Sequence, residues 1–265
     1  MQAAMGTSVL GSLAIQARVI GALLMREVIT RYGRHGLGFM WIFVEPMMFT
    51  LGVTALWSLS KSTHGSSLPI AEFAATGYST VLLWRNAASR CLLAIEPNLA
   101  LLYHRNVRVI DIFAARLLLE IAGGTISLMV ITLIFMGIGW MRAPIDLLYM
   151  IIAWLLLTWF TIALGLVVGA LSERSETFER IWHPITYLLF PLSGAVFMVE
   201  WLPAQAQKYI LWVPMVHCTE MLRHGYWGNA LRTHEDPAYL MLFSFILFFI
   251  GLALTRETGR RVEPE

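Results

Sequence analysis

The sequence contains little charge and almost no lysine. Asp, Glu, Lys and Arg together make up only 14% of its 265 residues, whereas 58% are hydrophobic. A soluble domain carries about 25% charged residues. Lys61 and Lys208 are the only lysines, so nearly all of the positive charge is arginine. This composition excludes an ordinary soluble domain and predicts an all-α integral membrane protein.

The motifs of several enzyme classes are also missing. A nucleotide-binding P-loop needs a Gly-Lys pair, and neither lysine follows a glycine. The zinc pattern HExxH is absent, since His234-Glu235 is followed by Asp236-Pro237, and the hydrolase pattern GxSxG is absent too. We therefore expect neither a catalytic residue nor a cofactor in this chain. Energy for work against a gradient would have to come from a partner or from ions.

Cysteine is scarce as well. Cys91 and Cys218 lie far apart without the spacing of a metal site, so we expect two small buried core residues and no metal. The first 34 residues carry scattered arginines rather than a compact basic, apolar and small-residue pattern. No cleaved signal peptide is expected.

Six apolar stretches approach the length of about 20 residues that a helix needs to cross a bilayer. The clearest contains no charged residue, whereas another is borderline because it contains Pro184 and Pro191. The expected spans are 39–60, 69–95, 117–140, 147–171, 181–199 and 238–255. An even number of spans places both termini on one side of the membrane.

The basic residues indicate which side this is, because they are enriched in cytoplasmic loops. With both termini in the cytoplasm, 12 basic residues lie inside and 5 outside. The inner set is Arg18, Arg26, Arg31, Arg34, Arg105, Arg108, Arg116, Arg174, Arg180, Arg256, Arg260 and Arg261; the outer set is Lys61, Arg142, Lys208, Arg223 and Arg232. We therefore predict cytoplasmic N- and C-termini.

Two segments differ from both spans and simple loops. Residues 14–34 mix apolar positions with arginines, which favours an amphipathic helix on the cytoplasmic membrane face over a solvated arm. Residues 200–236 are rich in aromatics, but their apolar runs are short and interrupted by prolines. This pattern predicts short re-entrant or interfacial helices on the outer side.

Two arginines inside the expected span 69–95 are the most unusual feature, because each costs roughly 2.5–3.5 kcal/mol near a bilayer centre. In a helix, Tyr78, Arg85 and Ser89 share one face, while Asn86 and Arg90 share an adjoining face. Such a helix can present guanidinium groups to an anionic or hydroxyl-rich ligand. Alternatively, the arginines pair with acidic residues and brace the bundle; the candidates are Glu45, Glu72, Glu96 and Glu120.

Three shorter patterns add detail. Residues 97–106 begin with a proline suited to a helix start and end in basic residues, as expected of a docking helix for a soluble subunit or of an ordinary turn. Residues 172–180 favour a solvated connector, with a second partner contact as the alternative. Gly165 and Gly169 form a GxxxG pattern that permits close helix packing.

Several strings of residues resemble one protein family. They are GFMWIFVEP at 38–46, GYST at 77–80, WRNAASR at 84–90, LYHRNVRV at 102–109 and ARLLLEIAG at 115–123. The chain resembles the membrane (permease) subunit of bacterial ABC exporters for capsular polysaccharide, especially those for lipid-anchored acidic polymers. The resemblance covers essentially the whole chain, and residues 84–123 are its specific part. The Glu-Pro pair is shared more widely, with other polysaccharide and teichoic-acid exporters.

The resemblance implies an inner-membrane homodimer in which each copy docks onto a cytoplasmic ATPase subunit that binds ATP and Mg²⁺. Residues 14–34 would be the interfacial helix at the substrate entrance, 97–106 the coupling helix and 200–236 the outer gate helices. The lipid-linked polymer would pass on to periplasmic and outer-membrane export proteins. Membrane lipids are the other expected partners, and nucleic acid is not one.

These expectations assign roles to particular residues. The substrate path is assigned Glu45, Tyr78, Trp84, Arg85, Asn86 and Arg90; the entrance and lipid anchor Arg26, Arg31 and Arg34; ATPase coupling Leu101, Leu102, Tyr103, His104 and Arg105; and the gate Trp201, Trp212 and Trp227. The path would be lined by the first, second and fifth spans.

Three rival hypotheses remain at this stage. An exporter of the same architecture could carry O-antigen or teichoic acid, although residues 84–123 argue against it. A membrane polymerase or acyltransferase could use His217, Glu220 or Asp236, but these residues have no recognised catalytic spacing. A scaffold for a synthesis complex would transport nothing.

Overall fold

The computed structural model describes residues 9–33, 36–60, 68–103 and 107–262, and all regular structure within these ranges is helical. The long helices are α1 (Val9–Tyr32), α2 (Gly36–Ser60), α3 (Ile70–Arg90), α5 (Val109–Gly137), α6 (Leu147–Ser172), α7 (Glu176–Leu192) and α10 (Pro237–Val262). The shorter elements are η1 (Glu96–Asn98), α4 (Leu99–Leu102), η2 (Val199–Trp201), α8 (Ala204–Ile210), α9 (Pro214–Trp227) and η3 (Gly228–Ala230).

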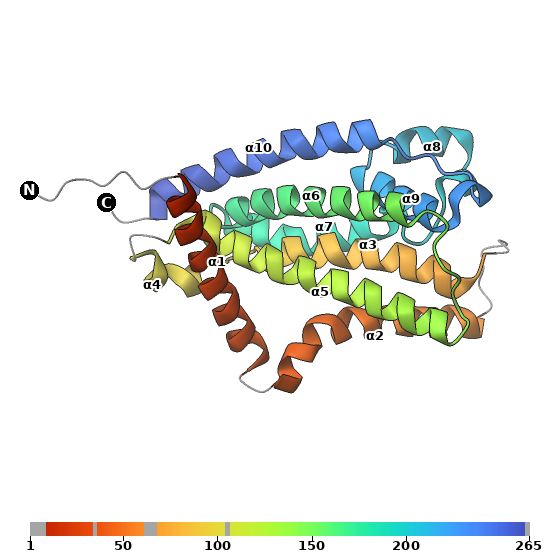
Figure 1. Ribbon diagram of the computed structural model, residues 1–265. Helices are drawn as coiled ribbons and strands as arrows, with labels where there is room; N and C mark the ends of the chain where they lie inside the picture. Colours follow the sequence, from red (N-terminus) through yellow and green to blue (C-terminus); the bar gives the residue numbers. More distant parts are fainter. Residues whose placement is uncertain (1–8, 34–35, 61–67, 104–106, 263–265) are drawn as a thin grey trace, which may run out of the picture.

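The helices form a bundle with two different ends (Figure 1). The start of α1, helix α4 and the end of α10 lie at one end, and α8 and α9 lie at the other. Helix α6 is central and packs against α3, α9 and α10. Its sequence is apolar on every side, as expected of a helix that is covered by neighbours all round.

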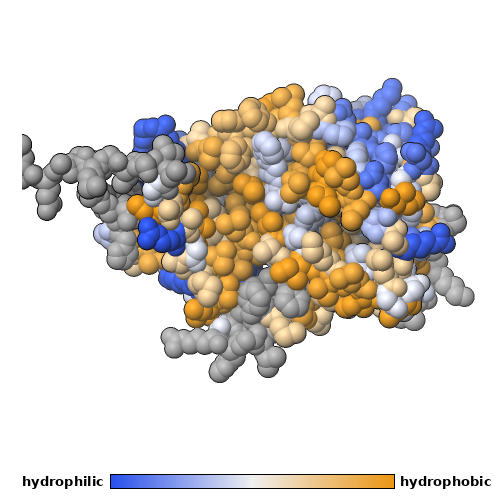
Figure 2. All heavy atoms as spheres, in the orientation of Figure 1, coloured by the Kyte–Doolittle hydropathy of each residue, from blue (hydrophilic) through white to orange (hydrophobic). Residues whose placement is uncertain are grey.

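Three helices of the described residues, α5, α6 and α10, are long and apolar enough to cross a membrane. They contain 29, 26 and 26 residues, and at about 1.5 Å per residue they exceed the roughly 30 Å of a bilayer core. Figure 2 shows an apolar band between more hydrophilic ends of the molecule. The other three expected spans fall on α2, α3 and α7, and their crossing of the membrane stays a prediction.

Polar side chains place several helix starts outside the apolar stretches. Helix α5 begins at Val109 rather than near 117, because the Asp111 carboxylate accepts a 2.9 Å hydrogen bond from the backbone N–H of Arg108. Helix α7 begins at Glu176, before the expected 181, because Ser175 caps it through the N–H of Phe178. Hydropathy alone misses these polar first turns.

Three other boundaries also differ from those expected. Helix α3 ends at Arg90 instead of near 95, and α7 ends at Leu192 instead of 199. Gly194 follows with φ +83°, a left-handed conformation that ends the helix and that glycine adopts without strain. The segment 97–106 forms only η1 and the single turn α4 before the described residues stop at 103, and residues 104–106 lie outside them.

Proline bends helix α2. Pro46 lies inside the helix and has no N–H to donate, so the hydrogen-bond ladder is broken there. The helix changes direction in Figure 1. At the bend, Glu45 lies beside α3, next to the candidate site.

The bundle core confirms two details of the sequence. Both cysteines are free and buried, as expected. The GxxxG pattern on α6 permits a close approach, because a Cβ added to Gly169 would lie 2.6 Å from the Phe113 ring and 3.0 Å from Cys91 Cβ. Helices α3 and α5 therefore pack closely against this face of α6.

We predict that Gly169→Ala destabilises the protein by about 1–3 kcal/mol, because the buried ring of Phe113 has no room to move away. Thermal unfolding in detergent should show a lower midpoint. Gly21→Ala is the matched control, since nothing lies within 4 Å of an added Cβ there. Equal midpoints for the two variants would contradict the close approach.

Candidate functional site

A groove runs between α2 and α3 and has a volume of about 690 Å³. It brings together Glu45, Arg85 and Asn86, three of the residues assigned to a substrate path. They come from positions about 40 residues apart, and the bend of α2 makes their approach possible. The whole lining consists of Trp41, Glu45, Pro46, Met48, Phe49, Leu82, Arg85 and Asn86.

A third helix reaches the groove through Arg85. Its guanidinium lies over the ring of Tyr187 on α7, with the carbon 4.8 Å from the ring centroid. This is a cation–π contact, which holds the guanidinium in place without neutralising its charge. Helices α2, α3 and α7 therefore meet at Arg85, and these are the first, second and fifth expected spans.

Arg90 has a different environment, although it lies only five residues further along α3. Its Nε is 3.6 Å from Glu120 Oε1 on α5, and the same oxygen accepts a hydrogen bond from Arg31 of α1. Arg116 pairs with Glu27 at 3.4 Å beside them. We call these five residues, Glu27, Arg31, Arg90, Arg116 and Glu120, the α1 charge cluster. Arg90, whose side chain is 44% exposed, is thus paired with Glu120 at the edge of this cluster.

A small cavity connects the groove with the α1 charge cluster. It holds about 10 Å³, enough for roughly one water molecule. Asn86 lines both the cavity and the groove, while Glu120 lines the cavity from the side of the cluster. Ser79 and Ser127 add hydroxyl groups to its wall. Asn86 therefore lies between the groove and a small polar cavity inside the bundle.

Two aromatic residues assigned to the path lie behind its wall. Tyr78 is 4% exposed and packs against the rings of Phe49, Trp57 and Phe190 at 5.6–5.7 Å. Trp84 is 1% exposed in the core of the bundle. Both side chains support the wall of the groove from behind. Their burial does not favour direct contact with a substrate.

The residues assigned to the entrance are held by the chain itself. Arg26 donates hydrogen bonds to the side chain of Asn98 and, at 3.3 Å, to the carbonyl of Pro97. Arg31 belongs to the α1 charge cluster, and Arg34 lies outside the described residues. The first two arginines tie α1 to η1 and α5. Glu120 compensates the charge of Arg31, whereas the Asn98 and Pro97 oxygens that hold Arg26 are neutral and leave its charge in place.

The segment 97–106 was predicted to be the coupling helix. Its described part has one side buried in the bundle and one side exposed. Leu102 is 5% exposed and packs in the core with the half-buried Leu101, whereas Tyr103 is 77% exposed. His104 and Arg105 lie outside the described residues. Of the five residues assigned to ATPase coupling, Tyr103 is thus the described side chain that a partner can reach.

The three gate tryptophans occupy unlike positions. Trp201 stacks on Phe73 of α3 with 5.4 Å between ring centroids. Trp227 is buried and donates a 3.1 Å hydrogen bond to the carboxylate of Glu72. Trp212 is 76% exposed. Two of the three therefore fix the outer segment to α3, and only Trp212 projects freely.

A buried arginine that the sequence analysis counted as an outer loop charge holds this segment together. Arg223 is fully buried on α9 and donates hydrogen bonds of 2.7–2.9 Å to the carbonyls of Gly194, Phe197 and Ala195. Its guanidinium carbon also lies 3.9 Å from the ring centroid of Phe73. The sequence did contain a sign of this role, because Arg223 lies within an apolar, aromatic-rich segment. A charged residue in such a segment is usually buried with a partner group in the same protein.

The comparisons with known proteins identify the family. A family model described as ABC-2 type transporter matches residues 18–227. The chain belongs to this family. Its relatives match it almost from end to end. They confirm the resemblance to capsular polysaccharide export proteins that the sequence showed.

Two relatives are similar at nearly half of all positions. The capsule polysaccharide export inner-membrane protein CtrC of Neisseria meningitidis serogroup B is 48% identical over 265 residues, which cover all of both chains. The capsule polysaccharide export inner-membrane protein BexB of Haemophilus influenzae is 46% identical over 254 residues, or 96% of each chain. The polysialic acid transport protein KpsM of Escherichia coli is 27% identical over 91% of this chain and 94% of its own.

We predict strong coupling between Arg31 and Glu120, because each side chain is only 15% exposed. A double-mutant cycle with Arg31→Gln and Glu120→Gln should give a coupling free energy of unfolding of roughly 0.5–3 kcal/mol. The exposed pair of Arg180 and Glu176 is the control, at about 0.3–0.5 kcal/mol. Additive effects at Arg31 and Glu120 would contradict the bracing role.

The outer segment contains a histidine that has to stay neutral. His217 accepts a 2.9 Å hydrogen bond at Nδ1 from the N–H of Asp236, and its Nε2 lies 2.8 Å from the carbonyl of Leu211. These contacts require the neutral form with the proton on Nε2. Burial lowers the pKa of His217 below its usual value, and this outweighs the opposite effects of the Leu211 contact, Asp236 and Glu235.

We predict that His217 contributes stability above about pH 6.5, its ordinary pKa, and that this contribution falls as the pH drops below that value. The sign follows because the unfolded chain binds a proton that the folded chain resists. Unfolding midpoints measured across this range should depend less on pH in His217→Gln than in the wild type. The same pH dependence in His217→Gln as in the wild type would contradict this role of His217.

Proposed function

We propose that the chain is the membrane subunit of an ATP-driven exporter that moves lipid-anchored, acidic capsular polysaccharide from the cytoplasm across the inner membrane. The main support is the end-to-end similarity to CtrC and BexB, whose names describe capsule export. The weaker similarity to a polysialic acid transport protein favours an acidic polymer, because every sialic acid unit carries a carboxylate.

The proposal includes partners that this chain needs. A transporter without a P-loop has to obtain its energy from a separate ATPase, and two such subunits would dock onto a homodimer of this chain. The exposed Tyr103, next to the buried Leu102, supports the segment 97–106 as the docking piece. Periplasmic and outer-membrane export proteins would receive the polymer.

The proposed orientation places the end of the bundle with α4 and the end of α10 in the cytoplasm. The arginines of the inner set support this orientation, since Arg108, Arg174 and Arg256 belong to that end. Helices α8 and α9 would then lie at the periplasmic side, where the buried Arg223 gives the outer segment a fixed shape.

The groove between α2 and α3 is proposed as part of the substrate path. The contact between Arg85 and the ring of Tyr187 does not neutralise the guanidinium. This charged group can therefore bind carboxylates of the passing polymer. Asn86 offers an amide on the same wall. The apolar remainder of the lining lets the polymer slide, because strong binding at every position would stop its movement.

We predict that Arg85→Gln lowers export about ten-fold, which corresponds to losing roughly 1.4 kcal/mol of charge-assisted binding. Arg90→Gln should instead lower the amount of folded protein, because Arg90 braces Glu120. Surface capsule and membrane protein level are measured in the same cells, with Arg180→Gln as an exposed control. Normal capsule in Arg85→Gln would remove this residue from the path.

The function itself is tested in a strain that lacks the gene. Loss of surface polymer with accumulation of lipid-linked polymer inside the cell is expected, and the intact gene should restore export. Analysis of the trapped polymer distinguishes an acidic capsule glycan from O-antigen. Continued export in the absence of the chain would refute the proposal.

A further inference from the structure

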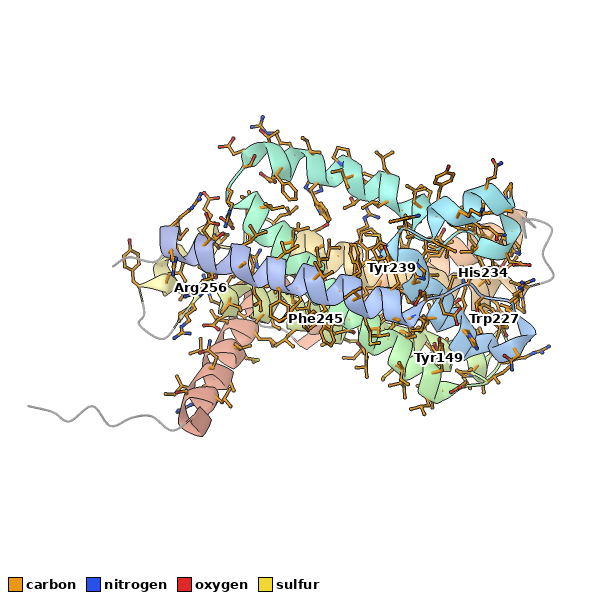
Figure 3. All side chains as sticks on the ribbon, turned by 90° about the horizontal axis from the view of Figure 1, so that it is seen from above. Tyr149, Trp227, His234, Tyr239, Phe245 and Arg256 are labelled. Atoms are coloured by element: carbon orange, nitrogen blue, oxygen red, sulfur yellow. The ribbon has the colours of Figure 1, made fainter. Side chains whose placement is uncertain are left out.

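A second groove lies between the first turn of α5 and the last turns of α10, with a volume of about 580 Å³. It lies at the end of the bundle that carries α4, since Arg256 in Figure 3 lies far along α10 from Tyr239, His234 and Trp227. The lining combines three arginines with an apolar wall: Arg108, Val109, Ile110, Leu252, Thr255, Arg256, Gly259 and Arg260.

Helical spacing directs the positive charge into this groove. Leu252, Arg256 and Arg260 are four residues apart and form one stripe along α10, and Thr255 and Gly259 form the stripe beside it. Arg108 faces them from the start of α5, whose helix dipole is positive at that end. The groove therefore presents three guanidinium groups to whatever enters it.

The acidic residues nearby are engaged elsewhere. Glu257 of α10 binds Arg174 at 3.0 Å and Arg261 at 2.6 Å. Asp111 of α5 is buried, where it accepts hydrogen bonds from the backbone of Arg108 and from the side chain of Gln16. Their contacts leave the charge of the groove positive.

Thr255 lies beneath the wall of the groove. The residue is 3% exposed, and its Oγ1 is closed off from the open space. The three arginines are therefore the polar groups that a ligand in the groove can meet.

The position of the groove in the membrane decides the kind of ligand. Helices α5 and α10 are both long and apolar enough to cross, and the groove lies at their ends, where lipid headgroups meet water. Ile110 and Leu252 provide an apolar surface of the kind that an acyl chain follows. Basic pockets between helices at this depth suit phosphate headgroups.

We infer that this groove binds the phosphate headgroup of an anionic membrane phospholipid, with Arg108, Arg256 and Arg260 as its ligands and an acyl chain along the apolar wall. The site is separate from the α2–α3 groove. It does not depend on the proposed substrate, because a structural lipid can bind to a transporter of any cargo.

The test is lipid retention by the purified full-length chain in nanodiscs of phosphatidylcholine with a minor fraction of phosphatidylglycerol. Native mass spectrometry after release into detergent should show phosphatidylglycerol retained on the wild type. Arg256→Gln/Arg260→Gln should retain at least ten-fold less. Arg180→Gln/Arg232→Gln removes the same charge from exposed positions elsewhere and should retain as much as the wild type.

Two further variants separate binding from folding. Thr255→Val changes only a buried hydroxyl group beneath the groove and should retain as much phosphatidylglycerol as the wild type. Arg256→Lys/Arg260→Lys keeps the charge and should restore most of the binding. Equal retention of both lipids by the wild type, or no effect of the glutamine variant, would overturn the inference. Unchanged lipid retention with lost binding of an ATPase subunit would assign the groove to a protein partner instead.

Discussion

Glu120 supplies the charge on which the arrangement of α1, α3 and α5 depends. Charged groups inside an apolar bundle have to be paired, because an isolated ion there is too costly. This one carboxylate on α5 takes Arg31 from α1 and Arg90 from α3. Glu27 and Arg116 repeat the contact between α1 and α5. These ion pairs hold α1 to the bundle in addition to the burial of Leu23, which packs in the core with Val19 and Leu24 beside it.

The same pairing explains why two nearby arginines have different uses. Arg90 pairs with Glu120, whereas Arg85 stays in the wall of the α2–α3 groove, where its guanidinium lies over the ring of Tyr187. Arg90 links α3 to α5 through Glu120, and α3 in turn presents Arg85 to the groove. The packed aromatic residues around Tyr78 then keep the wall rigid. A polar path in an apolar protein thus depends on separating charges that brace from charges that bind.

Much of the fold was predictable where apolar length decides it. The spans on α5, α6 and α10, the buried cysteines and the close packing at Gly169 all follow from local composition. Hydropathy failed at polar helix starts such as Val109, where a capping carboxylate continues the helix beyond the apolar stretch. It also treated Arg223 as an ordinary outer charge, although carbonyls distant in the sequence bury and satisfy it.

The sequence by itself determined a helical membrane protein of the ABC-2 family, with two arginines in an apolar segment and without the P-loop motif. These properties depend on composition, motif and similarity, which need no neighbours in space. The tertiary structure alone decided that Glu120 takes Arg90, that Arg85 joins Glu45 in one groove, and that three arginines of α5 and α10 converge. Pairing is a matter of distance between helices, and distances between helices are set only when the bundle packs.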